Sequence, residues 1–316
     1  MVGTVCGGFL GWDALAALAR LGVDPMALGA RPIGLVRIVV GTRAVEVALP
    51  GPAAGLSRAA LDEALLRAAA EAGARVERGC AIRRVDEGRV ILADGTAIAA
   101  ETLFVATGKH GLRGAARGSG KGSLGLRTTL PAPPDLVGVI ELHLFRDGYA
   151  GLLLQEDGAA NLCLSIAPAR FAACGGRPEA LIVALAAEAP RLADRAAAAI
   201  GRWDSIAAVP YGWRALSGER GRFRIGDQAA VIASLVGDGV AIALASGGAA
   251  ASACLAGEDG SDWQARFAAR AAPPLRLAEL ARAAAGRPRV GRALLPWIGR
   301  APGLLRLLAR ATRIGH

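Results

Sequence analysis

Lysine, histidine and aromatic residues are scarce in this sequence. Only Lys109 and Lys121 are lysines among the 37 basic residues, aromatic residues make up 4% of the chain, and there are 3 histidines. The net charge of +10 therefore comes from scattered arginines. Because no aromatic-rich basic strand or basic recognition helix accompanies this charge, nucleic-acid binding is not expected.

Cysteine is also sparse, and its spacing excludes two common kinds of site. No Cys-x-x-Cys pair occurs among Cys6, Cys80, Cys163, Cys174 and Cys254. A disulfide framework and a zinc site are therefore not expected, and we predict no metal site. This cysteine usage fits a reducing cytoplasm.

Long hydrophobic runs are absent as well. The N-terminus lacks the basic start, apolar core and cleavage site of a signal peptide. The longest uncharged stretch, 240–257, is rich in Ala, Gly and Ser and follows a Gly-rich turn, which predicts a tightly packed helix rather than a membrane span. With 53% hydrophobic residues over 316 positions, the chain can bury one large core or two smaller ones.

Helices and strands alternate in the first third of the chain. Apolar spacing predicts a helix over 12–21 that stops at Gly22, and a second over 57–73 that Ser57 caps. The strands expected here cover 35–40, 44–49 with a break at Pro50 and Pro52, 74–77, a hairpin over 85–101 around Asp94-Gly95, and 102–106.

From 137 to 166 the pattern changes to strict alternation. Arg146-Asp147-Gly148 and Glu156-Asp157-Gly158 interrupt it as turns, which predicts an antiparallel meander and a second lobe. Further elements are expected as helices over 178–188 and 191–200 and as strands over 207–213 and 222–225.

The most informative segment is 224–250, RIGDQAAVIASLVGDGVAIALASGGAA. Gly226 lets the backbone pass close to a bulky ligand, and Asp227 can accept hydrogen bonds from ligand hydroxyls. Gly237-Asp238-Gly239 leads at Val240 into a helix whose first N–H groups have no partner within the helix. This succession is typical of a cofactor cradle.

The segment resembles the second FAD-binding motif of the geranylgeranyl reductase and aromatic hydroxylase superfamily of flavoproteins. In that family the Asp holds the ribityl chain and the helix points its N-terminus at the isoalloxazine ring. The resemblance implies FAD as the cofactor. It places around the flavin the residues Gly226, Asp227, Gly237, Asp238, Gly239 and Val240.

The middle of the chain is similar to the same superfamily. GLSRAALDEALLRAAAEAGARVERG and VILADGTAIAAETLFVATGKHGLRG follow its order of helix, strand, hairpin and Ala-Thr-Gly strand end. The resemblance implies that Arg58 lies near the flavin or pyrophosphate, that the backbone at Ala81 and Ile82 meets the adenine, and that Thr107 and Gly108 close over the adenosine side. Taken alone, Arg58 fits a solvated arginine at a helix start better, and 106–108 fits a plain turn better.

The opening VCGGFLGWDALAALARLG and the run ATGKHGLRG resemble geranylgeranyl reductases and the flavin reductases encoded beside type III polyketide synthases. This resemblance implies that Cys6 faces the flavin, although a core cysteine fits the pattern as well. His110 is a candidate proton donor or a surface histidine, and Tyr149 a substrate contact or a core residue. Cys6, His110 and Tyr149 are thus candidates only, and no catalytic role is assigned.

Two departures from the superfamily matter. It opens with a strand, a Gly-x-Gly-x-x-Gly turn and a helix, whereas here only 120–125 matches that spacing, and LRTTLPAPP follows it. We therefore expect a shortened chain that binds FAD poorly. Aromatic hydroxylases carry Asp-Gly at the position that Thr107-Gly108 occupies in this chain, so a reductase or dehydrogenase is favoured. The alternatives are a monooxygenase and a truncated, non-catalytic relative.

Together these observations predict an α/β fold, α+β overall. An incomplete, doubly wound FAD-binding lobe would comprise 1–30, 54–112 and 220–262. An antiparallel substrate lobe would comprise 31–53 and 113–219, followed by a helical C-terminal region, 263–316.

The expected partners follow from the same resemblance. The substrate would be small and hydrophobic, isoprenoid-like or polyketide-like, and NAD(P)H is the candidate electron donor, although no nicotinamide site is evident. The tail from 284 to 316 mixes leucines and Trp297 with arginines. It is expected either to contact a membrane surface or to cap the enzyme, and the protein to be cytoplasmic, with membrane association as the variant.

Overall fold

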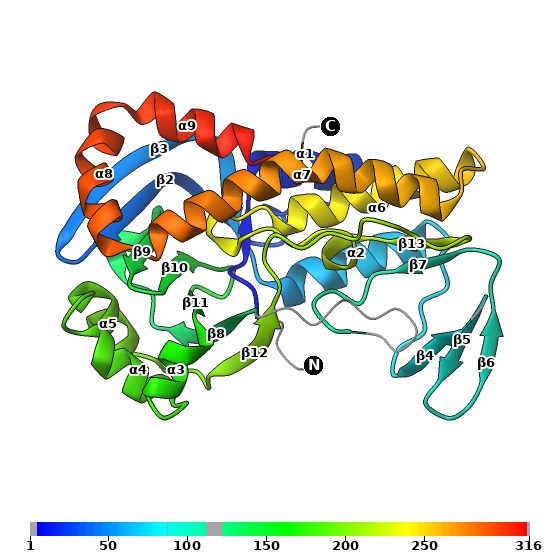
Figure 1. The fold of residues 1–316 in the computed structure, drawn as a ribbon, viewed down its shortest axis with the longest axis horizontal. Helices are drawn as coiled ribbons and strands as arrows, with labels where there is room; N and C mark the ends of the chain where they lie inside the picture. Colours follow the sequence, from blue (N-terminus) through cyan, green and yellow to red (C-terminus); the bar gives the residue numbers. More distant parts are fainter. Residues whose placement is uncertain (1–4, 87, 112–121, 315–316) are drawn as a thin grey trace.

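A curled eight-stranded sheet forms the left half of the molecule in Figure 1. The computed structural model describes residues 5–86, 88–111 and 122–314. In spatial order the strands are β1 (Phe9–Leu10), β3 (Arg43–Gly55), β2 (Arg31–Val40), β9 (Gly138–Phe145), β10 (Gly148–Leu154), β11 (Ala160–Ile166), β8 (Ser123–Leu130) and β12 (Asp204–Val209). The predicted meander is confirmed as β9, β10 and β11.

One junction of this sheet departs from the antiparallel pairing expected of it. β2 and β9 run parallel, with Arg37 opposite Glu141, because almost a hundred residues of other structure separate the two strands. The Arg37 guanidinium lies 2.8 Å from the Glu141 carboxylate. The junction therefore carries its own ion pair.

Glu141 is fully buried at the centre of a charged cluster. Arg195 donates to it at 3.0 Å and the His143 ring nitrogen Nε2 lies 2.8 Å away. Burial opposes the charged form of Glu141, but the hydrogen bonds from His143, Arg195 and Arg37 outweigh it and hold the carboxyl pKa well below its usual range. Burial also lowers the pKa of His143.

Strict alternation along β9 separates the two faces of the sheet. Glu141, His143 and Phe145 are buried toward a helical layer made of α3 (Pro168–Ala173), α4 (Pro178–Leu185) and α5 (Pro190–Ala197). Ile140 and Leu142 point to the opposite face, where they line a cavity. The expected helices at 178–188 and 191–200 are confirmed as α4 and α5.

The expected break at Pro50 and Pro52 is wrong, because β3 continues through both prolines to Gly55. Ala48 pairs with Leu35 and Ala53 with Ile33, so residues 49–52 face a single residue of β2. This bulge leaves the prolines outside the regular ladder, where their missing N–H group costs nothing.

The other half of the molecule is built around long helices (Figure 1). It contains α1 (Trp12–Arg20), α2 (Arg58–Glu71), α6 (Gly239–Leu255) and α7 (Gly260–Ala285), with β4 (Ile82–Asp86), β5 (Arg89–Leu92) and β6 (Ala97–Ala99) as a small antiparallel sheet. Ser57 caps α2 by accepting from the Ala60 N–H at 3.1 Å, as predicted.

A short parallel sheet lies beside α7. It holds β7 (Leu103–Val105) and β13 (Arg222–Arg224), and among the described residues no third strand joins them. The strand expected over 74–77 is wrong, because this segment is exposed and has no regular secondary structure, and no neighbouring strand pairs with it among the described residues. In the stretch 120–125, which has the Gly-x-Gly-x-x-Gly spacing, positions 120 and 121 lie outside the described residues. Ser123 begins the strand β8 rather than a helix.

Two helices, α8 (Pro288–Arg300) and α9 (Pro302–Ala311), lie over β2 and β3 as an outer layer (Figure 1). Their inner residues Leu295, Ile298 and Leu305 pack against the strands. No helix within the described part of the chain is long and apolar enough to cross a bilayer.

Gly55, at the end of β3, lets two strands approach closely, and its replacement tests the sheet. A Cβ there would lie 2.1 Å from the Leu154 carbonyl oxygen. We expect Gly55→Ala to lower the free energy of unfolding by about 1–3 kcal/mol in urea titrations, because the backbone of β10 must move. Gly34→Ala, whose Cβ meets nothing within 4 Å, is the control, and equal losses in both variants would contradict this account of β3.

Candidate functional site

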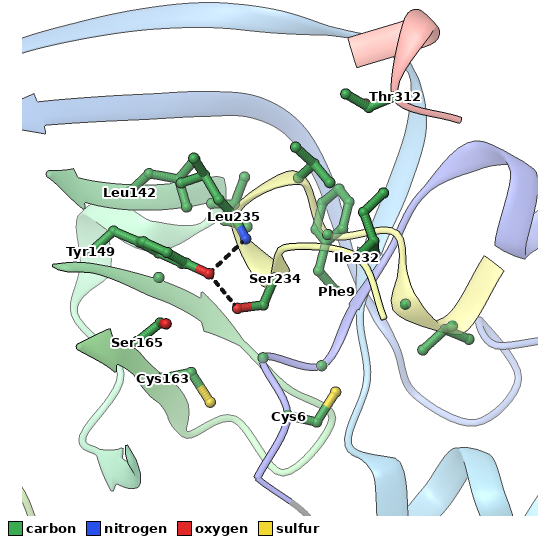
Figure 2. Close-up of a pocket in the computed structure, with 18 of the residues that line it drawn as sticks. Cys6, Phe9, Leu142, Tyr149, Cys163, Ser165, Ile232, Ser234, Leu235 and Thr312 are labelled. Atoms are coloured by element: carbon green, nitrogen blue, oxygen red, sulfur yellow. Dashed lines mark hydrogen bonds between the residues drawn. The ribbon is translucent and has the colours of Figure 1, made fainter. Parts of the chain in front are cut away.

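A cavity of about 580 Å³ lies between the inner face of the sheet and the helices α6 to α9. Its walls come from segments far apart in the sequence: the stretch 5–9, the strands β2, β9 and β10, the η3 turn (Ser234–Val236) and the C-terminal helices. Figure 2 shows Cys6, Phe9, Tyr149 and Ser234 converging from several of these segments. This volume lies within the range of small-molecule sites.

One end of the cavity is apolar. The sheet contributes Val36, Ile38, Leu49, Ile140, Leu142, Leu144 and Leu153. The helices opposite contribute Leu294, Leu295, Ile298, Leu305 and Leu308. A ligand group that enters here meets aliphatic side chains on both sides, so this end selects for apolar chemistry.

The other end is polar and includes the start of α6. Ile242 donates the first helical hydrogen bond, to the Asp238 carbonyl, so the N–H groups of residues 239–241 have no acceptor within the helix. Gly239 and Val240 line the cavity, and a Cβ on Gly239 would meet nothing within 4 Å. α6 is 17 residues long. The positive end of its dipole lies at these N–H groups and favours a negatively charged or electron-rich ligand group beside them.

Gly226 and Asp227 lie beside this helix start. The Gly226 N–H donates to Ser246 of α6 at 2.8 Å, which ties the η2 turn (Gly226–Gln228) to the helix. Asp227 lines the cavity and is half-buried. Gly237 has a simpler reason to be glycine, because a Cβ there would lie 2.6 Å from the Phe9 ring.

Lys109 extends into the polar end and was missed by the sequence analysis. Burial opposes its charge, but the electrostatic attraction of Asp227, Tyr211 and Cys6 outweighs burial and raises the pKa of Lys109. Lys109 is therefore a cation at neutral pH. The sequence offered two signals for this residue: Lys109 is one of only two lysines, and it directly follows the Ala-Thr-Gly turn.

Gln228 fixes the loop that carries Lys109. Its side-chain amide donates at 2.8 Å to the carbonyls of both Gly108 and His110, the two neighbours of Lys109. Gln228 is fully buried. The η2 turn thus supplies Asp227 to the cavity and, through the next residue, positions the lysine that faces it.

Both tyrosines of the chain meet at one serine. The Ser234 hydroxyl lies 2.6 Å from the Tyr149 hydroxyl and 2.8 Å from that of Tyr211, and Tyr149 also accepts from the Leu235 N–H at 3.1 Å (Figure 2). Burial raises the pKa of Tyr149 well above its usual value, so the phenol stays neutral. Tyr149 therefore holds the η3 turn against the sheet while its ring lines the cavity.

Cys6 and Cys163 also line the cavity (Figure 2). The Asn161 amide donates at 3.0 and 2.8 Å to the carbonyls of Cys6 and Gly7, which anchors this segment across β11. Burial raises the pKa of Cys163 to about 12, so it remains a thiol. Arg58 lies beside Cys6 and is held by Asp62 at 2.9 Å.

Asp238, expected at the cofactor, directs its side chain elsewhere. It is fully buried and contacts Arg313, which also lies 3.4 Å from Asp13 and stacks over the Trp12 ring. Burial is the main cause that raises the pKa of Asp238 to about 7, and the neighbouring charge of Asp13 adds to it. This cluster joins the end of the chain to α1 and to the start of α6.

The remaining expected residues divide into two groups. Cys6, Arg58, Gly108, Tyr149, Gly226, Asp227, Gly237, Gly239 and Val240 all line the one cavity. Ala81 and Ile82 are exposed at the start of β4, His110 is exposed, and the Thr107 hydroxyl donates to the His110 carbonyl at 3.0 Å. No cluster of metal ligands occurs within the described ranges.

The tyrosine pair generates a stability prediction. Tyr149→Phe leaves the Leu235 N–H without its acceptor, so we expect a loss of about 1–3 kcal/mol in the free energy of unfolding. Tyr211→Phe removes only one partner of Ser234 and is expected to cost less. Chemical denaturation of both variants checks this, and equal losses would show that the η3 turn does not depend on Tyr149.

The Asp238 cluster generates a pH prediction. Because the folded pKa lies above the unfolded value, the folded state holds this proton between about pH 4 and pH 7, and stability falls as pH rises through that window. Between pH 5 and pH 7, we expect the free energy of unfolding of the wild type to fall by roughly 2–3 kcal/mol more than that of Asp238→Asn. Thermal melts across this range measure it; parallel pH profiles for the two proteins would refute the assignment.

Comparisons with known proteins place the fold. Neither a family model nor a curated protein sequence matches the chain. The flavin-dependent brominase Bmp2 superposes with a TM-score of 0.74 at 16% identity, over 98% of this chain and 83% of that one. A variant of Klebsiella pneumoniae HpxO complexed with FAD superposes with a TM-score of 0.72 at 15% identity, over 98% of this chain and 90% of that one.

A third solved structure is PqsL from Pseudomonas aeruginosa, described as a probable FAD-dependent monooxygenase. It superposes with a TM-score of 0.66 at 15% identity, over 91% of this chain and 88% of that one. The chain therefore has the fold of FAD-dependent halogenases and monooxygenases.

Proposed function

We propose that this chain is an FAD-dependent oxidoreductase that acts on a small apolar substrate. The observation that carries the proposal is the division of one cavity into two ends. The start of α6, Asp227 and Lys109 form the polar end, and aliphatic side chains of the sheet and of α8 and α9 form the other. The fold, shared with solved flavoenzymes, supports the same cofactor.

The polar end fits the flavin half of FAD. The N–H groups at the start of α6, which have no acceptor within the helix, suit the electron-rich edge of the ring system, and Asp227 can accept from hydroxyls of a ribityl chain. Open space in front of Gly239 leaves room for a flat ligand. For the pyrophosphate, the described residues provide no glycine turn between a strand and a helix, so Arg58 is the cation proposed to meet it.

The chain's own residues then have distinct tasks. When bound, a flavin supplies the hydride or electron transfer. The N–H groups of α6 orient the ring, and Lys109 keeps a positive charge beside it. Tyr149 holds the η3 turn, and the aliphatic walls position the substrate and exclude water from it.

Two reactions are compatible with this site. We favour a reductase or dehydrogenase, with NAD(P)H as the proposed donor, because Thr107-Gly108 stands where aromatic hydroxylases carry Asp-Gly. The likeness to PqsL favours a monooxygenase as the second candidate. Turnover that persists without oxygen would support the reductase, and turnover that requires oxygen would support the monooxygenase. Our proposal for substrate remains an isoprenoid-like or polyketide-like compound.

FAD titration of the purified protein tests the cofactor. We expect binding, weak as the shortened sequence predicts, to quench flavin fluorescence at high FAD concentration. Asp227→Ala should raise the dissociation constant by roughly tenfold or more, because a charge-assisted hydrogen bond is lost. Asp194→Ala is the control, since Asp194 is exposed on α5 away from the cavity. A wild-type protein that leaves flavin fluorescence and absorbance unchanged would instead favour a non-catalytic relative.

A further inference from the structure

The outer face of α8 and α9 exposes large apolar side chains. Trp297 is 67% exposed, Leu304 67% and Leu307 64%, and Leu294 beside them is 46% exposed. They lie on successive turns of two adjoining helices that form the outermost layer of the molecule over β2 and β3 (Figure 1). Clustered exposure of this kind marks an interaction surface, whereas single exposed apolar residues do not.

The same face carries only positive charge. From 280 to 316 the sequence contains eight arginines and neither Asp nor Glu. Five arginines are exposed on α8 and α9: Arg289, Arg292, Arg300, Arg306 and Arg310. In the part of the chain that the structure describes, none of these five forms an ion pair with a carboxylate. Their charge is therefore available to a partner.

The cavity reaches the surface at this face. Leu294 and Arg306 are exposed and at the same time line the cavity. Behind them, Leu295, Ile298 and Leu305 turn inward. An apolar compound that leaves a hydrophobic phase beside α8 and α9 would thus enter the aliphatic end of the cavity without crossing water.

We propose that α8 and α9 dock this protein on the surface of an anionic phospholipid membrane. The exposed arginines contact lipid phosphates, and Trp297, Leu304 and Leu307 enter the boundary between headgroups and acyl chains. A second copy of the chain fits this face less well, because symmetric pairing would bring two arginine-rich surfaces together. Docking does not depend on the flavin, so it stands apart from the proposed function.

Sedimentation of the full chain with vesicles tests the proposal. We expect binding to phosphatidylcholine vesicles that contain phosphatidylserine, and weak binding to phosphatidylcholine alone. Two triple variants are each expected to lower the partition coefficient by roughly tenfold or more. The first combines Trp297→Ser, Leu304→Ser and Leu307→Ser, and the second combines Arg289→Gln, Arg300→Gln and Arg310→Gln. High salt should weaken the wild type as well.

Matched controls remove the same kinds of side chain elsewhere. The first combines Val183→Ser, Ile200→Ser and Leu216→Ser, which are exposed to similar degrees. The second combines Arg20→Gln, Arg83→Gln and Arg177→Gln, which are also exposed. Both should bind vesicles as the wild type does, and circular dichroism melts should show that all four variants are folded.

Three results would overturn the proposal. The first is a wild type that does not sediment with anionic vesicles. The second is vesicle binding that the α8 and α9 variants leave unchanged or that the controls lose equally. The third is a wild-type dimer in sedimentation equilibrium that the Trp297, Leu304 and Leu307 variant dissociates while lipid binding is absent, because a second copy would then cover this face.

Discussion

A buried carboxylate, that of Glu141, holds the junction on which the cavity depends. It binds Arg37 across the parallel pair β2 and β9, and it binds Arg195 of the helical layer behind them. Because side chains alternate along a strand, fixing Glu141 on one face fixes Ile140 and Leu142 on the other. A slip of one residue would exchange the two faces and place charge where the cavity now has aliphatic walls.

The cavity joins two kinds of structure that are built differently. The apolar end is formed largely by a sheet, and backbone pairing between strands determines its geometry. The polar end is formed by turns, and single side chains hold these turns in place. Gln228 holds the loop of Lys109, Asn161 holds the segment of Cys6, and Tyr149 holds the η3 turn. Positioning at the polar end is therefore sensitive to individual hydrogen bonds, and at the apolar end to the packing of the whole sheet.

Local patterns predicted much of this architecture, and contacts between distant residues explain what they missed. Helices α1, α2 and α6, the strands of the meander and the cavity position of Asp227 followed from caps, alternation and glycine turns. The role of Gln228 depends on a bond to Gly108, 120 positions earlier. Asp238 looked like a ligand residue, but it pairs with Arg313, 75 positions later. The prediction of a strand over 74–77 was wrong because, among the described residues, no neighbouring strand forms backbone hydrogen bonds with this segment.

The contact between Arg313 and Asp13 links residues 300 positions apart, and it has a consequence for biosynthesis. Arg313 and Thr312 line the cavity, so its wall is completed only after the 300 positions that separate Arg313 from Asp13 have been synthesised. Until then the aliphatic strands β2 and β9 lack the helices that cover them. During translation this apolar surface is open to chaperones and to other nascent chains, and the wall is complete only once this long loop has closed.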